Sequence, residues 1–410
     1  MGKKLLVAQS GGPTSAINAT LAGVIEAAIR NPEVSDVLGA RYGIQGVLRE
    51  QFLDLSGIEH IEDMLATLAV TPAAALGSCR FKLKDPAQDP SEFEELIRIF
   101  QKHEIGYFFY IGGNDSMDTV WKLSDYIKEH HIPDIVVVGA PKTIDNDLYG
   151  IDHCPGFGSA AKYIATSISE LERELEVYDT PYVIVVEMMG RNAGWLTAAA
   201  ALAESANSNV PYLIYLEERP FDLNDFISDL RGELAVGKDV IVAISEGIRD
   251  RSGKMICDYA DRDQSKDAFG HTIATGAGKV LENAIRSNIG CKVRYIELNL
   301  LQRCAGHLLS ETDITESTEL GRNAVRLAVD GQNGVMSTLT RTSNHPYSVA
   351  YGAADIADIA DREKKVPDSW ITSEGNGVTE EMLEYLRPLV QGERSCKFEN
   401  GIPKYIVFNK

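Results

Sequence analysis

Residues 135–147 read IVVVGAPKTIDND, an apolar run that passes directly into a charged turn. A short apolar run bounded by turn residues is typical of a buried strand. In the turn, Lys142 precedes Asp145 and Asp147, and two neighbouring carboxylates repel each other unless a metal, a cation or a proton relieves them. We therefore interpret this turn as a site of proton transfer or metal binding. A solvated surface turn is the alternative.

The same pattern of a strand followed by a polar turn recurs along the chain. Helical periodicity is expected over residues 16–30 and in a segment that ends near residue 127. Strands are predicted at residues 4–9, 107–111, 135–138, 182–186 and 239–244. This alternation predicts an α/β fold with a mainly parallel sheet, in which ligands bind beyond the carboxyl ends of the strands.

Two of these turns are rich in glycine. Gly11 and Gly12 follow the first strand, and a glycine there lets backbone amides approach a phosphate closely. A tight turn without a ligand explains the same residues. The turn after residue 111 carries Asn114 and Asp115, either of which could serve Mg²⁺ or cap the helix that follows.

Charge limits the possible ligands. The chain has 410 residues and a formal net charge of −20, so we expect no binding to nucleic acid. A small anionic substrate meets the same repulsion unless basic side chains converge locally. Arg191, Arg294 and Arg303 are candidates, because a guanidinium can hold a phosphate with two parallel hydrogen bonds.

Composition predicts a reduced, cytoplasmic protein. No run of eighteen apolar residues suggests a membrane span, and the first residues do not resemble a signal peptide. The six cysteines form no CxxC pair. Cys304 and His307 lie close in sequence but lack a second ligand pair, so we expect a structural role for Cys304.

At this point the motifs together resemble those of the 6-phosphofructokinases, in the same order, over residues 4–305. They are GG at 11–12, GSCR at 77–80, GGNDS at 112–116, PKTIDND at 141–147, MGR at 189–191, SEG at 245–247, Arg294 and QR at 302–303. The resemblance implies two Rossmann-like lobes with mainly parallel sheets, the active site between them, and a homodimer or homotetramer. It suggests boundaries of 1–150, 151–310 and 311–410 for the first lobe, the second lobe and a C-terminal elaboration.

The resemblance also implies a role for each matching residue. Asp145 matches the base that accepts the proton of the sugar 1-hydroxyl, and Asp147 matches its catalytic neighbour. Gly12, Arg80 and Lys142 match positions near the donor phosphates, and Asn114 matches a position for Mg²⁺. The positions that hold the sugar phosphate are matched by Thr143, Ile144, Met189, Gly190, Arg191, Glu246, Arg294 and Arg303.

Asp115 and Lys142 indicate the donor, because family members that use ATP usually carry glycine at both positions and those that use pyrophosphate resemble this chain. A carboxylate at 115 would repel and block a nucleotide α-phosphate, and an ammonium at 142 would stabilise the departing phosphate. The implied reaction is a reversible, Mg²⁺-dependent transfer from pyrophosphate to the 1-hydroxyl of fructose 6-phosphate, which gives fructose 1,6-bisphosphate and phosphate.

Some positions depart from the family pattern. Asn114 stands where aspartate is common, Leu300 where many members have histidine, and Tyr182 where many have an arginine donated across a subunit interface. Pro13 and Thr14 also differ from the turn of the ATP-using members. Three alternatives therefore stay open: an ATP-dependent kinase, sedoheptulose 7-phosphate as the acceptor, and an inactive subunit that senses sugar phosphate.

Overall fold

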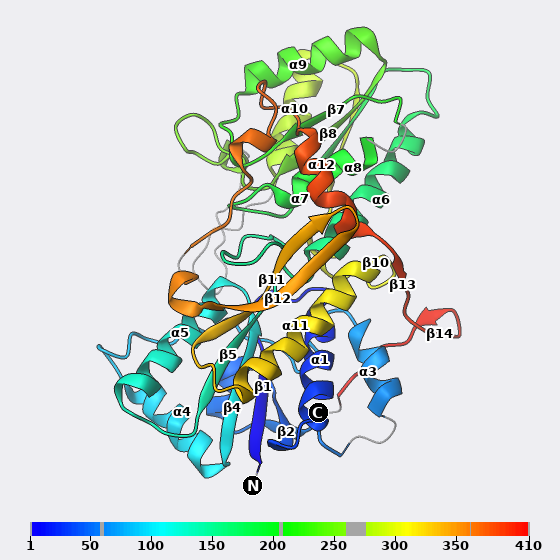
Figure 1. The fold of residues 1–410 in the computed structure, drawn as a ribbon. Helices are drawn as coiled ribbons and strands as arrows, with labels where there is room; N and C mark the ends of the chain where they lie inside the picture. Colours follow the sequence, from blue (N-terminus) through cyan, green and yellow to red (C-terminus); the bar gives the residue numbers. More distant parts are fainter. Residues whose placement is uncertain (1, 58–60, 205–207, 260–275, 361, 409–410) are drawn as a thin grey trace.

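The computed structural model describes residues 2–57, 61–204, 208–259, 276–360 and 362–408. The chain forms two lobes, each built around a β-sheet with helices on its faces (Figure 1). The larger sheet has seven strands and the smaller has four. The predicted α/β class is confirmed, and the predicted strand at residues 135–138 is β5, Val136–Pro141.

The sheet of the first lobe has the strand order β12-β11-β5-β4-β1-β2-β3. Its inner strands β2, β1, β4, β5 and β11 pair in parallel, and the strands at both edges are antiparallel. The strands are β1 Lys3–Gln9, β2 Val34–Ala40, β3 Phe52–Asp54, β4 Ile105–Gly112, β5 Val136–Pro141, β11 Val335–Asn344 and β12 Tyr347–Asp355.

Helices cover both faces of this sheet, which explains why β4 is buried throughout and reads as an unbroken apolar run. Phe108 faces the core under α4 and α5, while Phe109 faces the core under α1, α3 and α11. The helices are α1 Ile17–Ile29, α2 Gly43–Leu48, α3 Ile61–Ala69, α4 Ser91–Lys102, α5 Asn114–Glu129 and α11 Glu311–Val329, with the 3-10 turn η3 Ile356–Asp358.

The second lobe contains a wholly parallel sheet with the order β7-β8-β6-β9. Its strands are β6 Tyr182–Met188, β7 Tyr212–Tyr215, β8 Asp239–Ser245 and β9 Lys292–Glu297. Its helices are α6 Phe157–Leu175, α7 Trp195–Ala198, α8 Ala200–Glu204, α9 Leu223–Val236, α10 Ala277–Asn288 and α12 Glu380–Leu386, with 3-10 turns η1 Ile256–Tyr259, η2 Asn299–Arg303, η4 Asp368–Trp370 and η5 Arg387–Val390.

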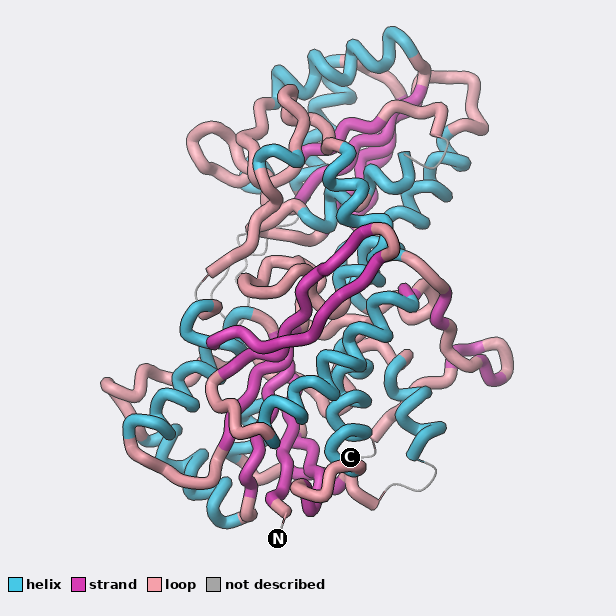
Figure 2. The backbone as a smooth tube through the Cα atoms, in the orientation of Figure 1, coloured by secondary structure: helices cyan, strands magenta, loops and turns pink. Residues whose placement is uncertain are grey.

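The C-terminal part of the chain belongs to both lobes. After the second lobe it returns to the first, where α11 packs on α1 and β11 pairs with β5. It then crosses again to place α12 against the second lobe (Figure 2). Four short strands complete it: β10 Leu309–Ser310 with β13 Glu393–Arg394, and β14 Phe398–Glu399 with β15 Ile402–Pro403. The boundaries at residues 150 and 310 stay predictions.

Two expectations from composition can be compared with the structure. All six cysteines lie in described segments, and none of them forms a disulfide bond. Among the residues that the structure describes, no helix combines the length and the apolar character needed to cross a membrane.

Candidate active site

The carboxyl ends of β1, β4 and β5 open onto one cavity of about 660 Å³, whose other wall comes from the second lobe. This is the edge at which a parallel sheet is expected to bind ligands. The cavity gathers most of the residues predicted for the site: Gly12, Arg80, Asn114, Asp115, Lys142, Thr143, Ile144, Asp145, Asp147, Met189, Arg191, Glu246 and Arg303.

Lys142 is the first residue after β5, and its side chain is nearly sealed from solvent, with 3% exposed. Its ammonium donates a hydrogen bond to the carbonyl of Gly12 at 2.5 Å. Burial lowers the pKa of Lys142 to about 8, against the opposing attraction of Asp145. The ammonium is therefore held in place at the Gly12 carbonyl, and burial weakens its hold on the proton.

Asp145 and Asp147 both face the cavity. Burial raises the pKa of each carboxyl, and repulsion from Asp145 and Glu363 raises that of Asp147 further. The Oδ1 atom of Asp145 finds no hydrogen-bond partner among the described residues. A carboxylate with a raised proton affinity and a free oxygen is suited to accept a proton from a hydroxyl group.

Asn114 and Asp115 begin α5, directly after β4 and Gly113. Asp115 lies in the first helical turn, where the free amides and the helix dipole favour negative charge. Asn114 donates from Nδ2 to Asp147 at 3.0 Å. Its buried Oδ1 has no hydrogen-bond partner in the part of the chain that the structure describes, so it presents a free oxygen.

The turn before α5 is tightly packed against the turn after β1. The hydroxyl groups of Ser10 and Ser116 lie 2.5 Å apart. A Cβ atom on Gly112 would stand 1.9 Å from the Ser116 oxygen, so only glycine fits there. The two glycine turns are thus held in one fixed arrangement.

The second lobe contributes the turns after β6 and β8. Gly190 has φ +115°, and a Cβ atom there would lie 2.5 Å from the carbonyl of Ala193. Beside it, the buried Nε of Arg191 has no partner among the residues described. Burial, with repulsion from Asp145, raises the pKa of Glu246 to about 8.

Arg303 brings the two lobes together at the turn after β1. It ends η2, and its guanidinium would lie 2.6 Å from a Cβ atom on Gly12. Gly12 therefore leaves space for an arginine that the sequence assigns to the other substrate. The predicted donor and acceptor residues share a single cavity.

Two predicted residues do not line the cavity. Gly190 only shapes the turn that carries Met189 and Arg191. Arg294 lies on β9, is exposed, and forms a side-chain hydrogen bond with Tyr182, at the start of β6. Its assignment to the sugar phosphate stays a prediction, which this cavity within one chain does not support.

Other cavity residues were missed from the sequence. Arg362 and Glu363 line the cavity from a segment that follows η3, and Arg362 stacks 3.7 Å from the centre of the Tyr149 ring. Asn192 donates to Glu363 at 2.8 Å. Residues 362–365 read REKK, a charge run with no motif, so the sequence offers no signal for their position.

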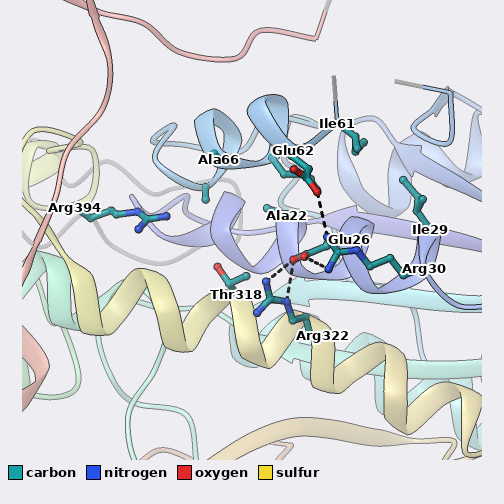
Figure 3. Close-up of a pocket in the computed structure, with 12 residues that line it drawn as sticks. Ala22, Glu26, Ile29, Arg30, Ile61, Glu62, Ala66, Thr318, Arg322 and Arg394 are labelled. Carbon is teal, nitrogen blue, oxygen red and sulfur yellow. Dashed lines mark hydrogen bonds and ion pairs between the residues drawn. The ribbon is translucent and has the colours of Figure 1, made fainter. Parts of the chain in front are cut away.

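A second, smaller cavity of about 270 Å³ lies between α1, α3 and α11 (Figure 3). Most of its charged side chains pair with one another, and Arg394 pairs with Glu311. Nε of Arg322 donates to Glu26 at 2.9 Å, and Glu26 also pairs with Arg30 at 2.7 Å. None of the residues predicted for the reaction lines this cavity.

The family model for phosphofructokinase matches residues 4–328. The chain belongs to the phosphofructokinase family. The pyrophosphate–fructose 6-phosphate 1-phosphotransferase of Halomonas elongata is 41% identical over 97% of this chain and 94% of its own. The enzyme of the same name from Xanthomonas campestris pv. campestris is 42% identical over 98% of this chain and 95% of its own.

The fold of this phosphofructokinase is also similar to solved structures. The crystal structure of a pyrophosphate-dependent phosphofructokinase from Nitrosospira multiformis superposes with a TM-score of 0.89 at 36% identity. The match covers 99% of this chain and 96% of that one. Because both chains are covered almost completely, the likeness includes the C-terminal segments that contribute Arg362 and Glu363 to the cavity of this phosphofructokinase.

Proposed function

We propose that this phosphofructokinase transfers a phosphoryl group reversibly from pyrophosphate to the 1-hydroxyl of fructose 6-phosphate, which yields fructose 1,6-bisphosphate and phosphate. The observation that carries the proposal is that Asp115 and Lys142 face the same cavity as Asp145. The printed names of the relatives from Halomonas elongata and Xanthomonas campestris support the same donor and acceptor.

In this proposal Asp145 is the general base. Its unpartnered Oδ1 accepts the proton of the sugar 1-hydroxyl while the oxygen attacks the terminal phosphorus of pyrophosphate. The bond from that phosphorus to the bridging oxygen breaks, and phosphate leaves with the electron pair. Asp147, hydrogen-bonded to Asn114, lies beside the base and completes the catalytic turn.

Lys142 and the arginines supply the positive charge that phosphoryl transfer requires. The buried ammonium of Lys142, held at the Gly12 carbonyl, stabilises the developing negative charge on the departing phosphate. Arg80, Arg191 and Arg303 all line the cavity. We assign Arg80 to the pyrophosphate and Arg191 and Arg303 to the phosphate of the sugar. Asp115 excludes a nucleotide by repelling its α-phosphate.

The residues fit a magnesium ion held mainly by its substrates. The described residues contain no group of three His, Cys, Asp or Glu side chains that could hold a metal ion alone. Mg²⁺ is commonly held by one or two side chains together with substrate phosphates and water. The free Oδ1 of Asn114 is suited to this role. When bound, the ion would neutralise charge on the pyrophosphate oxygens.

The proposal extends to assembly and location. We infer that the enzyme is a cytoplasmic homodimer or homotetramer, in which the exposed Arg294 of one chain reaches the sugar phosphate of another. The exposed position of Arg294, outside the cavity of its own chain, supports this arrangement.

Turnover of the purified chain tests the function. With pyrophosphate, Mg²⁺ and fructose 6-phosphate, we expect one phosphate released for each fructose 1,6-bisphosphate formed, and the reverse reaction from those products. Asp145→Asn should lower kcat by about 10²- to 10⁴-fold. The matched control is Asp118→Asn on α5, whose carboxylate pairs with Lys122 at 2.7 Å and should keep full activity. Binding of fructose 6-phosphate without turnover would instead indicate a sensing subunit, and faster turnover of sedoheptulose 7-phosphate would change the acceptor.

A further inference from the structure

The residue between the two catalytic aspartates points away from the cavity. Asn146 is fully buried and has φ +55°, a left-handed conformation that asparagine tolerates better than most residues. Asp145 and Asp147 line the cavity, whereas Asn146 does not. The conformation of this one residue therefore helps to direct both carboxylates to the same side.

Three groups hold the amide of Asn146. The backbone N–H of Cys154 donates to its Oδ1 at 2.9 Å, and the ammonium of Lys364 donates to the same oxygen at 3.3 Å. The Nδ2 of Asn146 donates to the hydroxyl of Tyr385 at 2.8 Å. Lys364 and Tyr385 both lie beyond residue 328, where the match to the family model ends.

The same two residues bind the backbone of the catalytic turn. Lys364 donates its backbone N–H to the carbonyl of Asp147 at 2.7 Å and its ammonium to the carbonyl of Asp152 at 2.6 Å. The hydroxyl of Tyr385 donates to that carbonyl of Asp152 as well, at 2.8 Å. The turn is thus fixed at its centre and on its C-terminal side by residues more than two hundred positions away in sequence.

Lys364 and Tyr385 are themselves held in place by the second lobe. The indole N–H of Trp195 donates to the carbonyl of Lys364 at 2.9 Å. The rings of Trp195 and Tyr385 pack with their centres 5.3 Å apart. In Figure 1 the segment after η3 runs from the first lobe to the second, and Lys364 lies on it. The catalytic turn of the first lobe is therefore connected to the second lobe through Lys364 and Tyr385.

We propose that Lys364 and Tyr385 are positioning residues for phosphoryl transfer, which act through Asn146 to hold Asp145 and Asp147 toward the substrates. The proposal rests on the proposed function of this cavity. Loss of either contact leaves the turn free to relax, and a displacement of about 1 Å at a reacting group can cost on the order of 10²-fold in rate. If Lys364 and Tyr385 only stabilised the fold, variants that still fold would keep the wild-type rate.

Tyr385→Phe tests the hydroxyl with little change in packing. We expect kcat to fall by about tenfold or more while KM for each substrate stays within about twofold, because Tyr385 does not line the cavity in which the substrates bind. Tyr215→Phe is the matched control, since its buried hydroxyl donates to Asp229 on α9 at 2.9 Å and neither residue lines the cavity or contacts the turn. Unchanged kcat in Tyr385→Phe, or an equal loss in the control, would overturn the proposal.

Lys364→Met tests the ammonium in the same way. The matched control is Lys162→Met, because Lys162 is also buried and donates to the carbonyls of Leu309 and Gly392, neither of which belongs to the catalytic turn. If Lys364 acts through Asn146, the losses in kcat from Lys364→Met and Asn146→Ala should not multiply in the double variant. Fully multiplicative losses would mean that the two residues act separately, which contradicts the proposal.

A measurement without turnover separates this inference from the proposed function. Amide hydrogen exchange of residues 143–148 should be faster in Tyr385→Phe and Lys364→Met than in the wild type or in the two controls. Unchanged exchange in this segment would overturn the inference even if pyrophosphate is the donor. Faster exchange would support the positioning role of Lys364 and Tyr385 even if the wild-type chain proves to use another donor.

Discussion

Lys142 illustrates how burial changes the properties of a lysine side chain. It is 3% exposed, and its ammonium is fixed at the carbonyl of Gly12. Water screens its charge poorly, so its attraction for an anion is stronger than that of a surface lysine. Burial also disfavours the ammonium and lowers the pKa of Lys142 to about 8. Burial thus strengthens the attraction of Lys142 for anions and also makes its protonation state sensitive to pH.

This pKa predicts an alkaline limit to activity. Lys142 is charged below pH 8 and neutral above it, so kcat/KM for pyrophosphate should fall about tenfold for each pH unit above 8. A pH profile of kcat/KM from pH 6 to 10 measures the effect. Lys142→Met should be slow throughout and lack this limb, which separates the lysine from ionisation of the substrate. The same limb in both proteins would contradict the role of Lys142.

At the level of single residues, the sequence predicted the cavity residues that lie in turns after strands. Asp145, Lys142 and Asn114 come directly after β5 or β4, and the geometry of a parallel sheet brings such turns to one edge. Arg362 could not be predicted in this way. Its position depends on where the chain passes from one lobe to the other, which no local sequence pattern indicates. Arg294 shows the opposite case, since its motif is present but its side chain lies outside the cavity.

Close helix packing shapes the first lobe at the level of elements. A Cβ atom on Gly321 of α11 would stand 2.1 Å from the carbonyl of Thr20 on α1, and one on Gly23 of α1 would stand 2.0 Å from the carbonyl of Thr318. Because both obstacles are backbone atoms, the helices must separate before a side chain fits. Two glycines therefore set the distance between α1 and α11.

Gly321→Ala is accordingly expected to destabilise the protein by about 1–3 kcal/mol, the usual range for overpacking, although alanine favours helix. Denaturant unfolding measures the change. Gly232→Ala on α9 is the control, because a Cβ atom there meets nothing within 4 Å, and it should stabilise by about 0.5–1 kcal/mol. Equal effects at the two positions would contradict the packing account.

The strands themselves were predictable from short apolar runs, but their partners were not all predictable. β5 pairs with β4, its predecessor in the chain, as expected for successive βαβ units. β5 also pairs with β11, about two hundred residues later, which completes the sheet. The sequence after residue 310 has no strong local pattern. It therefore predicts neither this strand pairing nor the contacts of Lys364 with the catalytic turn.

At the level of the whole molecule, an acidic protein must bind acidic substrates. The net charge of −20 repels phosphate, yet Arg80, Lys142, Arg191, Arg303 and Arg362 all line one cavity. Both lobes contribute, because Arg80 and Lys142 come from the first lobe and Arg191 and Arg303 from the second. Binding of the substrates therefore depends on the arrangement of the lobes, and overall charge would not reveal it.

The donor should depend on two residues of this cavity. Asp115→Gly combined with Lys142→Gly removes the carboxylate that repels a nucleotide and the cation that stabilises departing phosphate. We expect the double variant to lose pyrophosphate turnover by about 10²-fold or more while circular dichroism and thermal unfolding show a folded protein. Pyrophosphate turnover close to that of the wild type would contradict this assignment.

The central claim is that pyrophosphate is the phosphoryl donor, and a direct comparison of donors tests it. The measurement is kcat/KM of the wild-type chain for pyrophosphate and for ATP, each with Mg²⁺ and saturating fructose 6-phosphate. Repulsion between Asp115 and a nucleotide α-phosphate should cost several kcal/mol, so we predict a preference for pyrophosphate of about 100-fold or more. A preference for ATP would contradict the account.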